Sequence, residues 1–472
     1  MKIPLTSRLA ATALLPLTLT LGGCASFSAD GGFAVVAQTA KNRLGKDVQW
    51  QRSDSEQDAA AQRVRQLLAA PLSADDAVQI ALLNNRGLQA AFYELGVSEA
   101  DLVQAGRLAN PGFSFGRLRR GEETEFDRGL HFNLMRLLSM PAIHRMEQRR
   151  FEQTRREVTM QTLALAAETR KAYIIAVAAG QSVQYMQQVK KAADAGAELA
   201  RRMAQAGNFN KLLQAREQGF YADAALNLAR TEQAQMRARE KLTRLLGLWS
   251  GQTAFVLPAR LPDLPPAPEQ PADIEQLAMS QRLDVQAAKL GTEQLAQNLG
   301  LNRATRFINV LELGVVRNTS NTEPTQRGYE ITLELPLFDW GGARVAKAEA
   351  LYMQAVHRTA EIAVNARSEV REAYLAYRSS YDIARHYRDE IVPLKQRISE
   401  ENQLRYNGML IGVFDLLADA RSQISSVNSA IEASRDFWLA QADLEMSLLG
   451  KPSLGAVSIN AMPGGDASPA GH

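Results

Sequence analysis

The chain of 472 residues contains a single cysteine, few aromatic residues and almost no excess charge. One cysteine cannot form a disulfide framework within the chain. The formal net charge of +3 at pH 7 gives no reason to expect a nucleic acid or another polyanion as partner. Aromatic residues make up only 6% of the sequence, although hydrophobic residues reach 46%. This balance, which is rich in alanine, leucine, glutamine, glutamate and arginine, is typical of long helices.

The sequence also lacks the motifs of common catalytic and metal sites. Its five histidines are scattered, without the spacing of a metal site. Gly341 and Gly342 follow an expected strand but lack the Lys-Ser/Thr of a phosphate-binding loop. No serine lies in a nucleophile-elbow pattern. We therefore expect no enzymatic activity, no cofactor and no metal.

Long apolar runs are absent after the N-terminus. The apolar stretch over residues 9–21 follows a basic segment and is too short for a mature transmembrane helix, which predicts a secretory signal. The Leu-Gly-Gly-Cys motif that ends at Cys24 resembles a bacterial lipobox, which implies cleavage before Cys24 and diacylglycerol and N-acyl chains, such as palmitate, on this residue. An ordinary signal peptide with an incidental cysteine is the alternative. Ala25 at the next position, instead of Asp, favours the outer membrane by resemblance to the usual sorting rule.

The second half of the sequence repeats the first at an offset of about 200 residues. The matching pairs are Gln89-Ala90-Ala91 with Gln286-Ala287-Ala288, Phe115-Gly116 with Leu313-Gly314, Leu130-x-Phe132-x-Leu134 with Tyr329-x-Ile331-x-Leu333, Arg170-x-Ala172-Tyr173 with Arg371-x-Ala373-Tyr374, and Leu245-Leu246-Gly247 with Leu448-Leu449-Gly450. A solenoid unit is far shorter, at about 20–50 residues. The chain is therefore predicted to contain two copies of one large building block.

The repeat, the linker composition and the termini predict a domain layout. It comprises a lipoprotein signal peptide over 1–23, an N-terminal periplasmic segment over 24–71, a first repeat over 72–256, a Pro-rich linker over 257–273, a second repeat over 274–451 and a disordered tail over 452–472. The first repeat should begin with a helix that starts after Ser73, runs to about residue 108 and is interrupted near residues 84–87. The segment before it is polar and weakly patterned.

In each copy, a stretch with two-residue periodicity predicts a hairpin of two strands. Residues 112–137 alternate apolar with polar or small side chains around a polar loop, and residues 308–337 do the same. Strands of about ten residues match the length needed to cross an outer membrane with tilt. The polar positions that we expect on the water-filled side are Glu330, Thr332, Glu334, His131 and Asn133.

Each hairpin is followed by long helical segments. The expected helices cover residues 141–205 and 211–246 in the first copy and 343–406 and 413–449 in the second. The first of these would be about 95 Å long at 1.5 Å per residue. Pro393 should remove one backbone hydrogen bond and kink the second long helix, whereas Ala192 occupies the matching place in the first copy.

These elements have too few partners within one chain. Four strands cannot close a barrel around a lumen, yet an open sheet edge in lipid leaves backbone groups unpaired. Several chains must then share one barrel, and three chains would give twelve transmembrane strands. The long helices, far longer than the usual 11–12 residues, would pack with copies as a coiled-coil stalk or an α-helical barrel. Ordinary soluble hairpins packed on helices are the alternative.

Four passages carry a resemblance to a known family. They are Asn84-Asn85-x-x-Leu88-x-Ala90-Ala91, Leu333-x-Leu335-Pro336-Leu337-Phe338-Asp339-x-Gly341-Gly342, the segment from Arg405-Tyr406 to Leu417, and the Leu-Leu-Gly that closes each half. Over about residues 72–450 the chain resembles the TolC family of outer-membrane efflux proteins, specifically its lipoprotein branch. The resemblance implies a mainly α fold with a membrane β-barrel: a homotrimer with a shared twelve-stranded barrel and a twelve-helix periplasmic tunnel. It also implies a periplasmic adaptor and an inner-membrane pump as partners, of the RND rather than the ABC type.

The resemblance also identifies a periplasmic tip. In this family the turns between long helices contact the adaptor and open or close. The corresponding positions here are Gly207, Asn208, Arg405, Gly408 and Gly412. The alternative is that the glycines only end helices.

Two acidic residues follow the second turn. Asp415 and Asp419 are spaced i, i+4 on one helical face. In a trimer they would form carboxylate rings that select cations and control closure. Asp415, nine residues after Tyr406, matches the family's acidic tip position, whereas Asp419 lies one residue beyond the second usual place, where this chain has Ala418. Two solvated surface acids are the alternative.

Together these observations predict a passive exit duct, which leads from the periplasm to the exterior and is gated at its tip. The main alternative is a periplasmic coiled-coil structural or adaptor lipoprotein without a pore. Adaptors normally carry compact β-rich domains around one helical hairpin, whereas this chain is expected to have two such hairpins.

Overall fold

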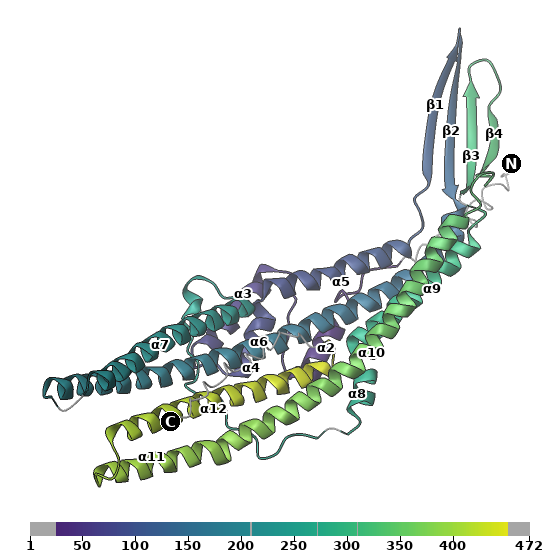
Figure 1. The fold of residues 1–472 in the computed structure, drawn as a ribbon. Coiled ribbons are helices and arrows are strands. Elements are labelled where there is room, and N and C mark those ends of the chain that lie inside the picture. The colour runs from purple at the N-terminus through teal and green to yellow at the C-terminus, as the bar shows by residue number, and fades with distance from the viewer. Residues whose placement is uncertain (1–24, 208–209, 271, 309, 452–472) are drawn as a thin grey trace.

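The computed structural model describes residues 25–207, 210–270, 272–308 and 310–451. The chain forms a long helical body from which a four-stranded sheet projects at one end (Figure 1). The predicted signal peptide over 1–23, the lipidation site Cys24 and the predicted tail over 452–472 lie outside the described residues. Asn208 of the first predicted tip turn does so too.

The N-terminal segment contains two helices that its weak sequence pattern did not predict. They are α2 (Phe33–Leu44) and α3 (Asp54–Leu68). Ser53 begins α3 with a capping box, in which its side chain accepts a hydrogen bond from the backbone N–H of Glu56. Phe33 at the start of α2 lies edge-on to Phe92, with ring centroids 4.9 Å apart, so this segment is held by burial against the first repeat.

The first repeat begins with the interrupted helix that the sequence predicts. It forms α4 (Ala74–Asn84) and α5 (Arg86–Ala105), which are separated at Asn85. Asn85 has extended backbone angles, and its side-chain oxygen accepts a hydrogen bond from the N–H of Leu88, so the residue ends one helix and caps the next.

The Asn-Asn pair also binds the end of a distant helix, α7 (Lys211–Leu246). The amide of Asn84 donates to the carbonyls of Leu246 and Gly247 at 3.0 and 2.7 Å, and the amide of Asn85 donates to the carbonyl of Leu245 at 3.0 Å. These carbonyls have no partner within α7 itself. Gly247 has φ 66°, and a Cβ there would lie 2.6 Å from the carbonyl oxygen of Asn84, which explains the glycine of the closing Leu-Leu-Gly.

The four strands form one antiparallel sheet in the order β1-β2-β3-β4. Their bounds are β1 Gly112–Arg120, β2 Glu123–Asn133, β3 Leu311–Ser320 and β4 Gln326–Leu333. The central pair, β2 with β3, joins the two copies. The first hairpin is shorter than predicted, because residues 134–137 are helical: Asn133 accepts a hydrogen bond from the N–H of Arg136 at 2.7 Å and caps a helix there. The second predicted hairpin, over 308–337, likewise ends early, because β4 stops at Leu333.

The first long helix is α6 (Leu134–Gln205), of 72 residues. At 1.5 Å per residue it is about 108 Å long. It begins seven residues before the predicted start at 141, so Pro141 lies inside its second turn, where it has no N–H to donate. Figure 1 shows α6 and α7 as an antiparallel pair that extends away from the sheet.

The second long helix is interrupted, as Pro393 predicts. It consists of α10 (Gly342–His386), a π-helical turn over Tyr387–Ile391, and α11 (Val392–Asn407). Because Pro393 carries no N–H, the carbonyl of Asp389, four residues earlier, loses its usual partner, and this residue lies within the wider turn. The chain then returns as α12 (Val413–Ser447). The two copies therefore differ here, since α6 is continuous.

Short elements connect the copies. A 3₁₀ turn over Ser250–Thr253 precedes the Pro-rich linker, and α8 (Ile274–Gln281) and α9 (Leu283–Ala304) open the second repeat. The described part of the linker has no helix or strand. Among the described helices, none combines the length and apolar character that crossing a membrane requires.

A buried arginine holds the second repeat together where α8 ends. Arg282 is 1% exposed, and its guanidinium donates to Asp284 at 2.6 and 3.0 Å and to Glu369 in α10 at 2.7 Å. It also donates to the carbonyl of Ser447 at the end of α12, at 3.3 Å. Burial works against its charge, but the hydrogen bonds and charges of both carboxylates outweigh this effect and raise the pKa of Arg282.

We predict that Arg282→Ala lowers the free energy of unfolding by about 3–5 kcal/mol, because two poorly exposed carboxylates would lose their common partner. Urea unfolding in detergent, followed by circular dichroism, measures this change. Arg260→Ala is the matched control. Its pair with Asp263 is exposed and 3.8 Å long, so its loss should cost at most about 1 kcal/mol. Equal effects of the two substitutions would contradict a structural role for the buried network.

Candidate functional site

The register of the sheet places two kinds of residue on opposite faces. We call one the apolar face. Its exposed or partly exposed large residues are Phe113, Phe115, Leu130, Phe132, Leu311, Leu313, Val315, Tyr329, Ile331 and Leu333. We call the other the polar face. It carries Ser114, Gly116, His131, Asn133, Glu312, Gly314, Glu330 and Thr332. Figure 1 shows the sheet standing beyond the helices, with no helix over either face.

The predicted lumen residues largely share one face. His131 of β2 and Glu330 of β4 both lie opposite Gly314 of β3, and Asn133 and Thr332 both lie opposite Glu312. His131 is 2.9 Å from the hydroxyl of Ser114 on the neighbouring strand. Glu334 is the exception, because it lies beyond the end of β4, although its N–H still donates to the carbonyl of Val310 at 3.3 Å.

The apolar surface continues from the sheet toward the helices. Leu335, Leu337, Phe338 and Trp340 are all exposed, and the Trp340 ring lies edge-on to Phe307 with centroids 6.3 Å apart. Contiguous exposed apolar surface of this kind marks a site of contact with lipid or protein. Aromatic residues at one border of such a band are typical of membrane-spanning β-structure.

At the opposite end of the molecule, the first predicted tip turn joins α6 and α7. Gly207 has φ 78°, a left-handed conformation that ends α6 and favours glycine. Asn210 caps α7 by accepting a hydrogen bond from the N–H of Leu213 at 2.9 Å. The helix-ending interpretation of Gly207 therefore applies, and its position at the end of a helical pair also leaves it available to a partner.

The second predicted turn is built differently. Gly408 has φ −80° and Gly412 also has φ −80°, so neither conformation requires glycine. The left-handed residue is Met409, with φ 59°. The carbonyl of Arg405 accepts a hydrogen bond from Leu410 at 2.8 Å, and the Arg405 side chain pairs with Glu401 at 3.1 Å. The turn thus projects Met409, which is 92% exposed, together with the exposed Leu410.

The two predicted gate residues have different surroundings. Asp415 is exposed, and its carboxylate accepts a hydrogen bond from the N–H of Gly412 at 3.2 Å, so it caps α12. Asp419 lies one turn further along and is partly buried. One of its oxygens is buried without a hydrogen-bond partner among the described residues. An unpaired carboxylate oxygen costs free energy unless a further group reaches it.

A pair that the sequence did not predict links the two copies near the tip. Arg421 in α12 donates to Glu217 in α7 at 3.0 Å, and its guanidinium lies 4.3 Å from the centroid of the Phe220 ring. The Glu217 side chain is only 4% exposed. Ile424 of α12 also packs against the α6–α7 pair close by. The two helical pairs are therefore connected by an ion pair and by apolar packing.

The duplication contains a signal for this site. Glu217 and Asp419 both lie seven residues after the residue that caps their helix, Asn210 in one copy and Gly412 in the other. They are thus equivalent positions. A sequence comparison between the copies would have indicated that Glu217 belongs with the acidic residues of the tip.

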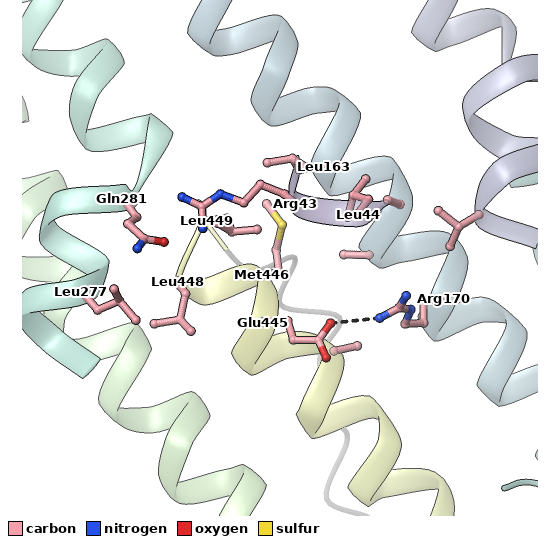
Figure 2. A pocket seen from close by; sticks show the side chains of 14 residues that line it. Arg43, Leu44, Leu163, Arg170, Leu277, Gln281, Glu445, Met446, Leu448 and Leu449 are labelled. Carbon is pink, nitrogen blue, oxygen red and sulfur yellow. Dashed lines mark hydrogen bonds and ion pairs between the residues drawn. The ribbon is translucent and has the colours of Figure 1, made fainter. Parts of the chain in front are cut away.

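A cavity of about 360 Å³ lies where the two copies meet (Figure 2). Figure 2 shows Leu277 and Gln281 of α8 on one side, Leu163 and Arg170 of α6 on the other, and Glu445 and Met446 of α12 between them. Arg170 donates to Glu445 at 3.0 Å. Burial raises the pKa of Glu445, and the charge of Arg170 opposes this shift.

The lining of this cavity is mainly aliphatic and contains no serine, cysteine or histidine. Its only carboxylate is paired with arginine. The cavity therefore lacks a nucleophile and a free acid–base pair, and it lies at the joint between the copies. Within the described ranges, no group of three or more histidine, cysteine or acidic residues is placed to hold a metal ion.

We compared the sequence and the fold with those of known proteins. No family model matches the sequence, and no curated protein matches it either. Solved structures do match its fold. A membrane protein from Pseudomonas aeruginosa is 20% identical, with a TM-score of 0.69 over 82% of this chain and 92% of that chain. The CmeC outer membrane channel of Campylobacter jejuni is 17% identical, with a TM-score of 0.66 over 79% and 85%. The open MtrE outer membrane channel of Neisseria gonorrhoeae is 19% identical, with a TM-score of 0.65 over 79% and 88%.

This chain therefore shares its fold with solved outer-membrane channels such as CmeC and MtrE. The resemblance that the sequence motifs indicate is thereby confirmed at the level of the fold.

We predict that Arg421→Ala loosens the connection between the helical pairs near the tip. It leaves the buried carboxylate of Glu217 without its partner, at a cost of about 1–3 kcal/mol. Amide hydrogen exchange over residues 418–425 should then accelerate about tenfold or more. Arg216→Ala is the control, because Arg216 is exposed beside Glu217 and forms no ion pair among the described residues. Unchanged hydrogen exchange in Arg421→Ala would show that the ion pair does not hold the two helical pairs together.

Proposed function

We propose that the protein is an outer-membrane channel of a tripartite efflux or export system. It would act as a passive conduit from the periplasm to the exterior. The observation that carries this proposal is a projecting sheet with one apolar and one polar face and no covering helix, which continues into a pair of helical hairpins about 100 Å long. The shared fold with the CmeC and MtrE outer membrane channels supports it.

The proposed channel is a homotrimer. In the described structure, β1 pairs only with β2, and β4 only with β3, so each has one edge without a partner. In lipid such edges must be paired, because no water is present to satisfy their backbone groups. Three chains joined edge to edge give a closed barrel of twelve strands. The apolar face would then contact lipid, and the polar face would line the lumen.

The proposed gate lies at the end of the helices remote from the sheet. Three copies of Asp415 and Asp419 would bring carboxylates together around the axis and attract cations. The partly buried Asp419, with its unpaired oxygen, is suited to a contact with another chain. The Glu217–Arg421 pair would hold the two helical pairs of each chain in a closed arrangement.

The proposed partners are a periplasmic adaptor at the tip and, through it, an inner-membrane pump of the RND rather than the ABC type. The exposed Met409 and Leu410 of the second turn offer an apolar contact, with Arg405 beside them. Gly207 and Asn208 of the first turn would complete the contact, as the family resemblance implies.

The proposed membrane anchor is acylated Cys24. A diacylglycerol and an N-acyl chain would hold the N-terminus at the outer membrane in addition to the barrel. The first described residues place this end near the base of the sheet: the carbonyl of Ala25 accepts a hydrogen bond from Arg107, which lies shortly before β1. An anchor at this position is compatible with a sheet that enters the same membrane.

We predict that the purified protein forms ion-conducting channels in planar bilayers and that these prefer cations. In Asp415→Ala/Asp419→Ala, the cation-to-anion permeability ratio should fall severalfold, and a protein that is silent at rest should begin to conduct. Asp382→Ala is the control, since this residue is exposed on α10 away from the tip. If the wild type and the double variant both assemble and insert into the bilayer but neither conducts, the result favours the alternative of a periplasmic scaffold without a pore.

We predict that Cys24→Ser abolishes the incorporation of labelled palmitate in bacterial cells, because this is the only cysteine of the chain. Ala25→Asp should keep the label but move the protein from the outer-membrane to the inner-membrane fraction on a density gradient. Palmitate labelling of Cys24→Ser would rule out the proposed anchor.

A further inference from the structure

Arginines lie side by side on the apolar face of the sheet, toward the hairpin loops. Arg128 of β2 lies opposite Arg317 of β3, and Arg317 lies opposite Arg327 of β4. Arg117 of β1 is diagonal to Arg128 on the same face. All four side chains are exposed. We call these four residues the arginine row.

The arginine row is not neutralised by the chain itself. Like charges that face each other directly across strands destabilise a sheet. Within the described residues, no carboxylate forms an ion pair with a member of the row. The acids of the first hairpin do not share this face, because the strand alternation places Glu123, Glu125 and Asp127 on the polar face.

The contacts of the row within the chain are weak. The guanidinium groups of Arg117 and Arg128 lie 5.7 and 5.8 Å from the centroid of Phe126, which is at the limit of a cation–π contact. Four guanidiniums on one exposed face therefore keep most of their hydrogen-bond donors free for another molecule.

The position of the row along the strands matters as much as its charge. On β4, Arg327 is followed on the same face by Tyr329, Ile331 and Leu333. The distance along the strand from Leu333 to Arg327 is about 20 Å at 3.3 Å per residue. Because the exposed apolar surface continues past Leu333 toward Trp340, the row lies at the border of the apolar band that is remote from the helices.

We propose that the arginine row binds the phosphate groups of a phosphorylated glycolipid in the outer leaflet of the outer membrane. This inference rests on the proposed function, which places the apolar face in lipid and the hairpin loops at the exterior. The acyl chains would then lie along Phe113, Leu130 and Val315, directly below the row. Guanidinium groups bind phosphate oxygens with two parallel hydrogen bonds, and their spacing across three strands suits a headgroup with more than one phosphate.

The charge balance favours this occupant over a zwitterionic lipid. A zwitterionic headgroup brings its own cation, which the row would repel, whereas a headgroup with several phosphates neutralises the arginines that now face each other. Binding would therefore remove the like-charge cost in the sheet. A ligand that binds only the folded sheet also raises its stability by mass action.

The experiment uses the purified, acylated, full-length protein in detergent. Bis-phosphorylated lipid A is titrated while bound lipid is counted by native mass spectrometry, and dephosphorylated lipid A and phosphatidylethanolamine are titrated alongside. The wild type should bind the bis-phosphorylated form at least about tenfold more tightly than either other lipid, the margin that hydrogen bonds to charged groups provide. Its thermal unfolding midpoint should rise only with that form.

Three substitutions locate the binding. Arg128→Gln/Arg317→Gln/Arg327→Gln should bind bis-phosphorylated lipid A about tenfold or more weakly. Arg317→Gln alone should weaken it less, and Arg317→Lys should fall between Arg317→Gln and the wild type, because it keeps the charge but loses the paired hydrogen bonds. Arg120→Gln is the matched control, since this exposed arginine lies on the polar face near the same loop. It should bind as the wild type does.

Equal binding of phosphorylated and dephosphorylated lipid A, or wild-type binding by the triple variant, would overturn the proposal. If the triple variant fails to assemble, the single variants and the comparison of lipids decide the question. The oligomeric state and the bilayer conductance of the same preparation separate the two proposals. A conducting trimer without phosphate-dependent binding refutes only the lipid site, whereas a monomer without conductance refutes the channel.

Discussion

Backbone hydrogen bonding at the edges of the sheet is the constraint on which the rest of this molecule depends. Four strands that project from a helical body leave the outer edges of β1 and β4 open and both faces uncovered. In water the apolar face of this sheet has no covering element, and in lipid the sheet is forbidden unless its edges are paired. The apolar face suits contact with lipid, and the proposed association of three chains would pair the open edges.

A buried polar network holds each repeat of the helical body together. Asn84 and Asn85 bind the carbonyls at the end of α7, and Arg282 gathers α8, α10 and the end of α12. The first network lies within the first repeat and the second within the second repeat, and the buried polar groups of each network are paired, which makes the packing of each repeat specific as well as stable. Beyond these networks the long helices extend as antiparallel pairs, which the Glu217–Arg421 ion pair connects near the tip.

Local patterns predicted the elements of this fold well, because hairpins and long helices have characteristic periods. Pro393 likewise predicted an interruption where the π-helical turn lies. What depends on tertiary contacts was missed: α2 is stabilised by Phe33 against Phe92, and the Glu217–Arg421 pair forms between helices of different copies. At the tip, family resemblance emphasised Gly408, but the backbone places Met409 in the left-handed conformation. No residue pattern distinguishes these cases without the packing around them.

The π-helical turn of the second copy has a consequence for any ring that this chain builds. In such a ring, continuous α6 helices would alternate with α10–α11 helices, which a π-helical turn interrupts. In the proposed trimer, a ring of six hairpins would therefore have threefold and not sixfold symmetry. A protein that binds the outside of the proposed trimer would meet two different grooves for each subunit, so six identical copies of it would have to bind in two different orientations.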